Sequence, residues 1–134
     1  MRAKLPEEAP VVLMGDFNAR LGSEEITWVR ADEFVDTWEQ VRGPDAPGFT
    51  WEAESNLNIQ TYYDVPDPYD ASVSVWEELK ALNRQVSRRI DYIFVKNVPG
   101  EHIMVGKVVL NHAPGNQHPS DHFGVLTKIN FNPK

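Results

Sequence analysis

The chain has 134 residues, of which 41% are hydrophobic and 25% are charged, as in an ordinary globular domain with a modest core. It contains no cysteine, which excludes disulfides, thiolate nucleophiles and zinc sites built from cysteine. No apolar run approaches the length that a transmembrane helix needs.

Acidic residues outnumber basic ones by 20 to 13, which gives a net charge of −7. A protein that binds duplex nucleic acid usually carries a basic stripe that replaces the phosphate counterions. The one tight basic cluster here spans only Arg84 to Arg89. The charge balance therefore favours a small or isolated phosphate group over duplex nucleic acid.

The N-terminal part begins with a nearly continuous apolar run, residues 10–14, which ends at a glycine. Such a run predicts a central strand that is buried on both faces. Ser23 is followed by two glutamates, which is typical of a helix N-cap and predicts a helix to about Ala31. Short strands are expected at residues 34–38 and 49–51, with a glycine- and proline-rich loop between them.

The remainder combines a long polar segment with three strands. Residues 52–74 are polar and lack a regular period, so we expect a long surface loop. An apolar stripe at helical spacing predicts a helix from residue 75 to about 86. Strands are predicted over 89–95, 103–110 and 123–131, the last of them with the alternation of a half-buried strand. The fold class expected is α/β (α+β), with five or six strands and two helices.

Three short segments bring polar side chains to strand ends, and the first is GDFN at residues 15–18. Asp16 and Asn18 would project to the same side of an extended chain, where a carboxylate and an amide can serve one ligand. Ligands of α/β sheets collect beyond the carboxyl ends of strands, which supports this interpretation. The alternative is a simple turn, and the segment taken alone favours it.

The second segment is the predicted strand over residues 89–95, where alternation puts Asp91 on an apolar face. A buried carboxylate is costly unless it is paired or hydrogen-bonded, so Asp91 needs a partner. An ion pair with Arg88 or Arg89 would satisfy it without any catalytic role.

The third segment is Ser120–Gly124, which contains Asp121 and His122 just before the last predicted strand. One ring nitrogen of His122 would need an acceptor, usually a buried carboxylate, and Asp91 is the best candidate. The alternative is a surface histidine that caps a turn. We assign that role to the other three histidines, His102, His112 and His118.

In this order the three segments resemble the endonuclease/exonuclease/phosphatase superfamily, which includes DNase I-like nucleases, neutral sphingomyelinases and inositol phosphatases. The matching motifs are GDFN (15–18), RIDYIFV (89–95) and SDH (120–122). Gly48–Trp51 with Asn56 also resembles the G-x-T-W/Y…N stretch of the bacterial and sphingomyelinase-like branches. The resemblance covers nearly the whole chain, but residues 52–87 are longer and more polar than in those branches.

The resemblance implies a role for each site residue. Asp16 and Asn18 would line the site that activates the attacking water and holds the phosphoryl oxygens, and Asp121 would assist at the metal or nucleophile. His122, oriented by Asp91, would contact the scissile phosphate. Asp16, Asn18 and Asp121 are the expected metal-binding residues, and hard oxygen ligands suit Mg²⁺ or Mn²⁺ rather than zinc.

The resemblance also implies that the chain is the C-terminal half of such a domain. The first half of the family's fold supplies an Asn, a metal-binding Glu and another catalytic residue, and Glu7 and Glu8 do not match that glutamate. We therefore expect half of a DNase I-like four-layer sandwich, a mixed sheet with flanking helices, whose inner face is uncovered. That face would bind the missing N-terminal half or a second copy, and the isolated chain would be inactive.

The expected function is metal-dependent hydrolysis of a phosphodiester or phosphomonoester by water attack at phosphorus. The alternative is a non-catalytic binding or structural module, against which the presence of all five site residues argues. Nucleic acid, a phospholipid head group and a sugar or inositol phosphate remain open as substrates, as does the cellular compartment. Aromatic residues of the long loop could contact lipid or a sugar ring, although simple packing is the commoner role: Trp51, Tyr62, Tyr63, Tyr69 and Trp76.

Overall fold

A computed structural model describes residues 6–61, 81 and 86–131 of the chain. Its strands are β1 (Val11–Asp16), β2 (Val35–Asp36), β3 (Asp91–Lys96), β4 (Ile103–Val109) and β5 (Gly124–Ile129). Its helices are α1 (Glu24–Ala31), α2 (Thr37–Arg42) and α3 (Leu57–Thr61), with short 3-10 turns at η1 (Gly100–His102) and η2 (Pro114–Asn116). No helix in these ranges has the length and apolar character to cross a membrane.

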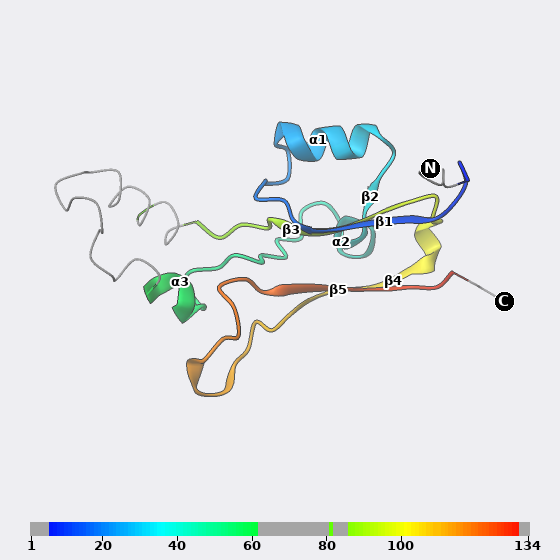
Figure 1. Cartoon of the computed structure of the whole chain (residues 1–134). Coiled ribbons are helices and arrows are strands. Elements are labelled where there is room, and N and C mark those ends of the chain that lie inside the picture. The colour runs from blue at the N-terminus through cyan, green and yellow to red at the C-terminus, as the bar shows by residue number, and fades with distance from the viewer. Residues whose placement is uncertain (1–5, 62–80, 82–85, 132–134) are drawn as a thin grey trace, which may run out of the picture.

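The strands form two antiparallel sheets, one with the order β1-β3-β2 and one made of β4 and β5. Helix α1 covers one face of the three-stranded sheet, and the β4–β5 pair lies on the opposite side (Figure 1). The Thr37 hydroxyl joins the two sheets, because it donates to the carbonyl oxygen of Ile93 at 2.8 Å and lies 2.7 Å from the Thr127 hydroxyl. The predicted α+β class is confirmed, although every pairing among the described strands is antiparallel rather than mixed.

Two small cores hold these layers together. Beneath α1, the rings of Tyr92 and Phe94 stack at 5.1 Å and pack against Ile26, which is fully buried. The second core joins the α3 region to the start of β3 and consists of Trp51, Ala53, Ile59 and Ile90. The first core fixes the sheet to its helix, and the second lies beside the expected site residues.

Strand β1 is an edge strand, so the predicted central strand buried on both faces is wrong for the described part of the chain. Met14 is 71% exposed and Val12 is 44% exposed. Residues opposite one another in an antiparallel pair share a face, and these two lie opposite Ile93 and Val95. Met14 and Ile93 line, with Val125 of β5, a hollow of about 220 Å³ between the sheets. The apolar run is thus suited to burial, but none of the described elements covers it.

Several other predicted elements are confirmed close to their expected ends, namely α1, β3, β4 and β5. The strand expected over residues 34–38 is only two residues long, because the Asp36 carboxylate accepts the Trp38 N–H at 3.0 Å and thereby caps helix α2. The strand expected over residues 49–51 is reduced to one bridge between Trp51 and Arg88.

The polar segment that was expected to be a surface loop, residues 52–74, contains helix α3. Ala53, Asn56 and Ile59 are buried there, so this part of the segment belongs to the second core. The polar composition of the segment did not indicate this packing, since only a few of its side chains are apolar and face inward. Residues 62–74 and nearly all of the helix expected over 75–86 lie outside the described residues.

A buried hydroxyl provides a test of this packing. The Tyr92 hydroxyl lies 3.0 Å from the carbonyl oxygen of Ala19 and 2.8 Å from that of Arg89. Burial raises the pKa of Tyr92 to about 12, against the opposing effect of the Arg89 charge. Since the folded pKa exceeds the unfolded value of about 10, this group's contribution to stability is complete below about pH 10 and is lost as the pH rises through about 12.

We expect Tyr92→Phe to lower the free energy of unfolding by about 1–3 kcal/mol at neutral pH, because buried carbonyl oxygens lose their donor. The variant should also lose less stability than the parent chain between about pH 10 and 12. Urea denaturation at several pH values measures both effects. Parallel stability curves for the two chains over the alkaline range would contradict the assignment.

Candidate functional site

The strand register of the three-stranded sheet brings two acidic residues together. Asp16 is the last residue of β1 and Asp91 the first of β3, and they lie directly opposite one another in the antiparallel pair. Both side chains therefore point to the same face, away from α1. Two neighbouring carboxylates repel unless a cation or a hydrogen-bond donor lies between or beside them. This end of the sheet therefore has the electrostatic character of a cation-binding site.

His122 supplies the first such donor. Its Nδ1 atom lies 2.8 Å from Oδ2 of Asp91, and both side chains are partly buried. This is the contact expected from the sequence. A neutral imidazole that donates from Nδ1 keeps Nε2 available for a ligand. The ring also packs edge-on against Trp51 at a centroid distance of 5.1 Å, so its orientation is fixed from two sides.

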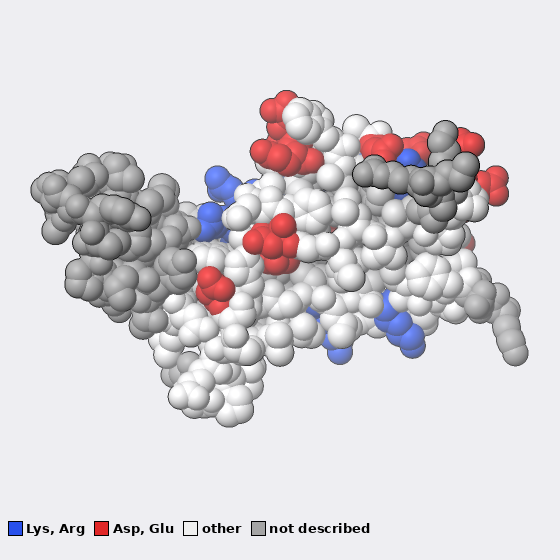
Figure 2. All heavy atoms as spheres, viewed as in Figure 1, with Lys and Arg blue, Asp and Glu red and all other residues white. Residues whose placement is uncertain are grey.

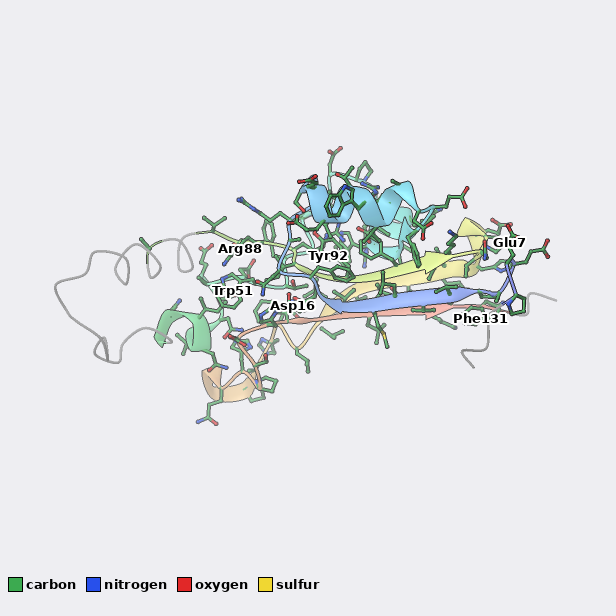
Figure 3. The ribbon with its side chains drawn as sticks, turned by 45° about the horizontal axis from the view of Figure 1, so that its top comes forward. Glu7, Asp16, Trp51, Arg88, Tyr92 and Phe131 are labelled. Atoms are coloured by element: carbon green, nitrogen blue, oxygen red, sulfur yellow. The ribbon has the colours of Figure 1, made fainter. Side chains whose placement is uncertain are left out.

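Asp16, Asp91 and His122 each offer one ligand atom within 4.8 Å of the other two. Among the described residues, no other group of three histidine or acidic side chains meets this criterion. The donor set fits a hard divalent cation, because carboxylate oxygens supply the charge and the hydrogen bond to His122 uses only one oxygen of Asp91. The site lies at the end of β1 opposite Glu7 (Figure 3).

The segment around Asn18 forms a turn rather than an extended chain. Asn18 has a φ of 49°, and its backbone N–H donates to Oδ1 of Asp16 at 2.8 Å. The expectation that Asp16 and Asn18 project together from extended backbone is therefore wrong, because the chain turns within two residues. Asparagine tolerates this left-handed conformation better than most residues do. The turn nevertheless leaves the side chains of both Asp16 and Asn18 exposed.

Asp121 lies in the same segment as His122 and makes a local contact. Its carboxylate accepts a hydrogen bond from the Ser120 hydroxyl at 3.2 Å, and within the described residues it does not belong to the three-residue group around Asp16. Of the expected metal-binding residues, Asp16 belongs to the three-residue group, together with Asp91 and His122, whereas Asn18 and Asp121 do not.

Thr50 is a positioning residue to which the sequence pointed only through the G-F-T-W stretch, without a role. Its fully buried hydroxyl lies 3.1 Å from the backbone nitrogen of Ile90 and 3.2 Å from that of Asp91, and it accepts from both. Its carbonyl oxygen accepts the N–H of Phe123 at 2.7 Å. One residue therefore fixes the backbone of Asp91 relative to the segment that carries His122.

Asn56 holds the other side of that segment. Its buried amide nitrogen donates to the carbonyl oxygens of Ser120 and Asp121, at 3.0 and 3.1 Å. Its side-chain oxygen accepts the backbone N–H of Asn58 at 3.0 Å, so the amide is satisfied on both ends. In the sequence, only the resemblance of Gly48–Trp51 and Asn56 to the family pointed to Asn56.

His118, expected to cap a turn, contributes a third tie to the same loop. Its ring nitrogens lie 3.2 Å from the carbonyl oxygen of Leu110 and 3.1 Å from that of Ser55. Asn58 donates to the carbonyl oxygen of His118 at 2.9 Å. The loop that leads to His122 is thus fastened to the α3 region at several points.

We expect Asn56→Ala to destabilise the chain by about 1–3 kcal/mol, because two partly buried carbonyl oxygens lose their donor. The loss should also loosen the His122 segment and speed hydrogen exchange of the Phe123 N–H. Urea denaturation and amide exchange measured by NMR check the two effects. Asn58→Ala is the matched comparison, since it frees a single carbonyl oxygen further from His122. Equal exchange rates for Phe123 in both variants would contradict the positioning role.

The family model described as Endonuclease/Exonuclease/phosphatase family matches residues 1–122. This span contains the turn at residues 15–18, strand β3 and the Ser120–His122 segment, and so every part of the site. No curated protein and no solved structure matches the chain. The family includes hydrolases that act on phosphate esters, typically with a divalent metal. The chain belongs to the endonuclease/exonuclease/phosphatase family.

Proposed function

We propose that this chain hydrolyses a phosphodiester or phosphomonoester by water attack at phosphorus, with Mg²⁺ or Mn²⁺, when its domain is complete. The observation that carries the proposal is the 2.8 Å hydrogen bond between His122 and Asp91 directly beside Asp16. An imidazole oriented by a carboxylate, next to an exposed carboxylate, combines phosphate recognition with metal binding in one cluster.

His122 is the proposed contact to the scissile phosphate. Its Nδ1–H donates to Asp91, so Nε2 is directed away from that carboxylate and can meet a phosphoryl oxygen. The hydrogen bond to Asp91 holds the ring so that Nε2 could meet this oxygen as negative charge develops there. The edge-on contact with Trp51 limits rotation of the ring, which keeps this donor aligned before substrate binds.

Asp16 is the proposed principal ligand of the cation and acceptor of the proton from the attacking water. Asn18 follows it on an exposed turn, where its amide can donate to a second phosphoryl oxygen. Asp121 assists as a further ligand from the segment before β5. The bound cation would supply Lewis-acid charge that stabilises the phosphoryl group and lowers the pKa of water.

Metal binding by the chain tests the cluster directly. We expect Mn²⁺ to broaden NMR signals of Asp16, Asp91 and His122 selectively, because a paramagnetic ion acts on nearby nuclei. Asp16→Asn should weaken Mn²⁺ binding about tenfold or more, since it removes a charged ligand. Glu54→Gln is the control, because it makes the same change of charge on an exposed side chain outside the group.

Equal Mn²⁺ affinity in the two variants would contradict metal binding at this site.

In the complete domain, His122→Gln is expected to lower kcat for an aryl phosphate ester by about 10²–10⁴-fold, the usual contribution of a positioned acid or base. Unchanged kcat in that variant would instead support a non-catalytic module.

We further propose that the apolar face of β1 is covered, in the active enzyme, by strands that complete the sandwich and add metal ligands. Support comes from the exposure of Val12 and Met14 on a strand that is at the edge of its sheet among the described residues. Leu126 of β5, in the second sheet, is also exposed. Such a surface favours pairing with another strand over contact with water.

In the isolated chain we expect a second copy to occupy this face, giving concentration-dependent association and negligible phosphodiesterase activity. Met14→Glu should shift the chain toward monomer, because it buries a charge in the contact. Met104→Glu is the control, because it makes the same change at an exposed methionine on β4. Solution scattering over a concentration series measures the association.

A monodisperse monomer of the parent chain would overturn the covered-face proposal. So would magnesium-dependent turnover of an aryl phosphodiester by the chain alone that His122→Ala abolishes. The latter result would leave the proposed chemistry standing while removing the need for a completing segment.

A further inference from the structure

The ring of His118 lies between two carbonyl groups. His118 belongs to the loop between β4 and β5, four residues before His122. Its Nδ1 atom lies 3.2 Å from the carbonyl oxygen of Leu110, and its Nε2 atom lies 3.1 Å from that of Ser55. Leu110 directly follows β4, whereas Ser55 lies just before α3. The ring therefore links the beginning of the loop to the α3 region.

The two contacts place different demands on the two charge states of the ring. A carbonyl oxygen only accepts hydrogen bonds, and a neutral imidazole carries a hydrogen on one nitrogen alone. In a neutral ring the other nitrogen would direct its lone pair at a carbonyl oxygen, and the two atoms would repel each other. The imidazolium form has an N–H on both nitrogens and can donate to both oxygens. The arrangement therefore fits a protonated His118.

The backbone of Leu110 is stabilised by this contact. Its φ of 63° lies in the left-handed region, which a leucine adopts only where surrounding contacts hold it there. The Leu110 side chain is 55% exposed, so its burial contributes little to this conformation. A charge-assisted hydrogen bond is about twice as strong as a neutral one, so a protonated His118 holds the Leu110 carbonyl group better than a neutral ring does. The strained conformation thus favours the imidazolium form.

The same ring contacts the residue next to His122. Its centroid lies 5.3 Å from that of the Phe123 ring, at an interplanar angle of 48°. Phe123 is buried, and its N–H donates to the carbonyl oxygen of Thr50 at 2.7 Å. Asn58 donates to the carbonyl oxygen of His118 at 2.9 Å. Because the His118 residue contacts the α3 region on one side and Phe123 on the other, a loosened ring would also loosen the segment that carries His122.

The loop around His118 contains few ionisable groups. Residues 110–120 include no Asp, Glu, Lys or Arg, so His112 and His118 are its ionisable side chains. Figure 2 shows neither acidic nor basic side chains on the visible face of the projecting loop that carries η2. In the described part of the chain the His118 ring makes no ion pair, and the ionisable side chains of adjoining segments are exposed or bonded elsewhere: Glu52, Glu54, Lys107, His112, Asp121 and His122. The two carbonyl oxygens are therefore the groups that respond to the charge of this ring.

We propose that protonated His118 is a positioning residue, which clamps the loop that carries His122 to the α3 region. Because the proton stabilises the clamped loop, this contribution is present at low pH and is lost as the pH rises and the ring becomes neutral. Histidine is the side chain that ordinarily changes charge between about pH 5 and 8, so the clamp responds to pH near neutrality. Its effect on hydrolysis rests on the proposed function, whereas the clamp itself does not.

NMR spectra that correlate ring hydrogens with ring nitrogens show directly how many nitrogens of each histidine carry a hydrogen. We expect His118, in the whole chain with EDTA present, to keep both hydrogens at a pH at which His112 has lost one. His112 is the internal comparison, because it is exposed and lies in the same loop. Loss of the proton from both rings at the same pH would overturn the proposal.

Hydrogen exchange of the Phe123 N–H tests the consequence for the loop. His118→Gln keeps an N–H donor for one carbonyl group but has no proton to lose in this pH range. We expect exchange about tenfold faster than in the parent chain at about pH 6, where the charged donor is missing, and a ratio near one at about pH 8. His112→Gln is the control, because it makes the same change at an exposed histidine. A ratio that is the same at both pH values would show a merely structural role and overturn the proposal.

Kinetics of the complete domain separate this proposal from the proposed function. With an aryl phosphate ester, His118→Gln is expected to lower kcat about tenfold at about pH 6 and to leave it close to the parent value at about pH 8. An equal effect at both pH values would overturn the positioning role. Absence of turnover in the parent domain would count against the proposed function alone, because the ring and exchange measurements use neither metal nor substrate.

Discussion

The hydrogen bonds of Thr50 are the interaction on which the rest of the structure depends. Its hydroxyl accepts from the backbone at Ile90 and Asp91, and its carbonyl oxygen accepts from Phe123. Three segments far apart in the chain thus meet at one fully buried residue. Because a buried hydroxyl satisfied in this way tolerates little displacement, Asp91 and the loop that carries His122 keep a fixed separation.

Strand register adds an electrostatic constraint to this junction. Direct opposition of Asp16 and Asp91 concentrates negative charge at a strand end, at a cost that folding alone does not require. The His122 contact relieves part of that repulsion, and a divalent cation would relieve more. Local destabilisation of this kind is typical of sites that bind ligands. The acids are therefore better explained by ligand binding than by the stability of the sheet.

Patterns carried by a single segment were predictable from the sequence, whereas contacts between distant segments were not. His122 needed an acceptor for one ring nitrogen, and this requirement identified Asp91 correctly. The roles of Thr50 and Asn56 depend on backbone groups 40 or more residues away, which leave no local periodicity. The exposure of β1 could not be predicted either, since an apolar run shows a capacity for burial but not the element that provides it.

The pairing of β1 with β3 also has a consequence for how the chain reaches its native state. This ladder joins residues 11–16 to residues 91–96, so it forms only after residues 91–96 have been synthesised. Non-local strand pairing is slow, because the entropy of closing the loop is lost before the contacts form. During that interval Val12–Met14 is an unpaired apolar strand, and such strands are prone to aggregate. Strand β1, which carries Asp16, would therefore benefit from early pairing with a neighbouring strand or from binding by a chaperone.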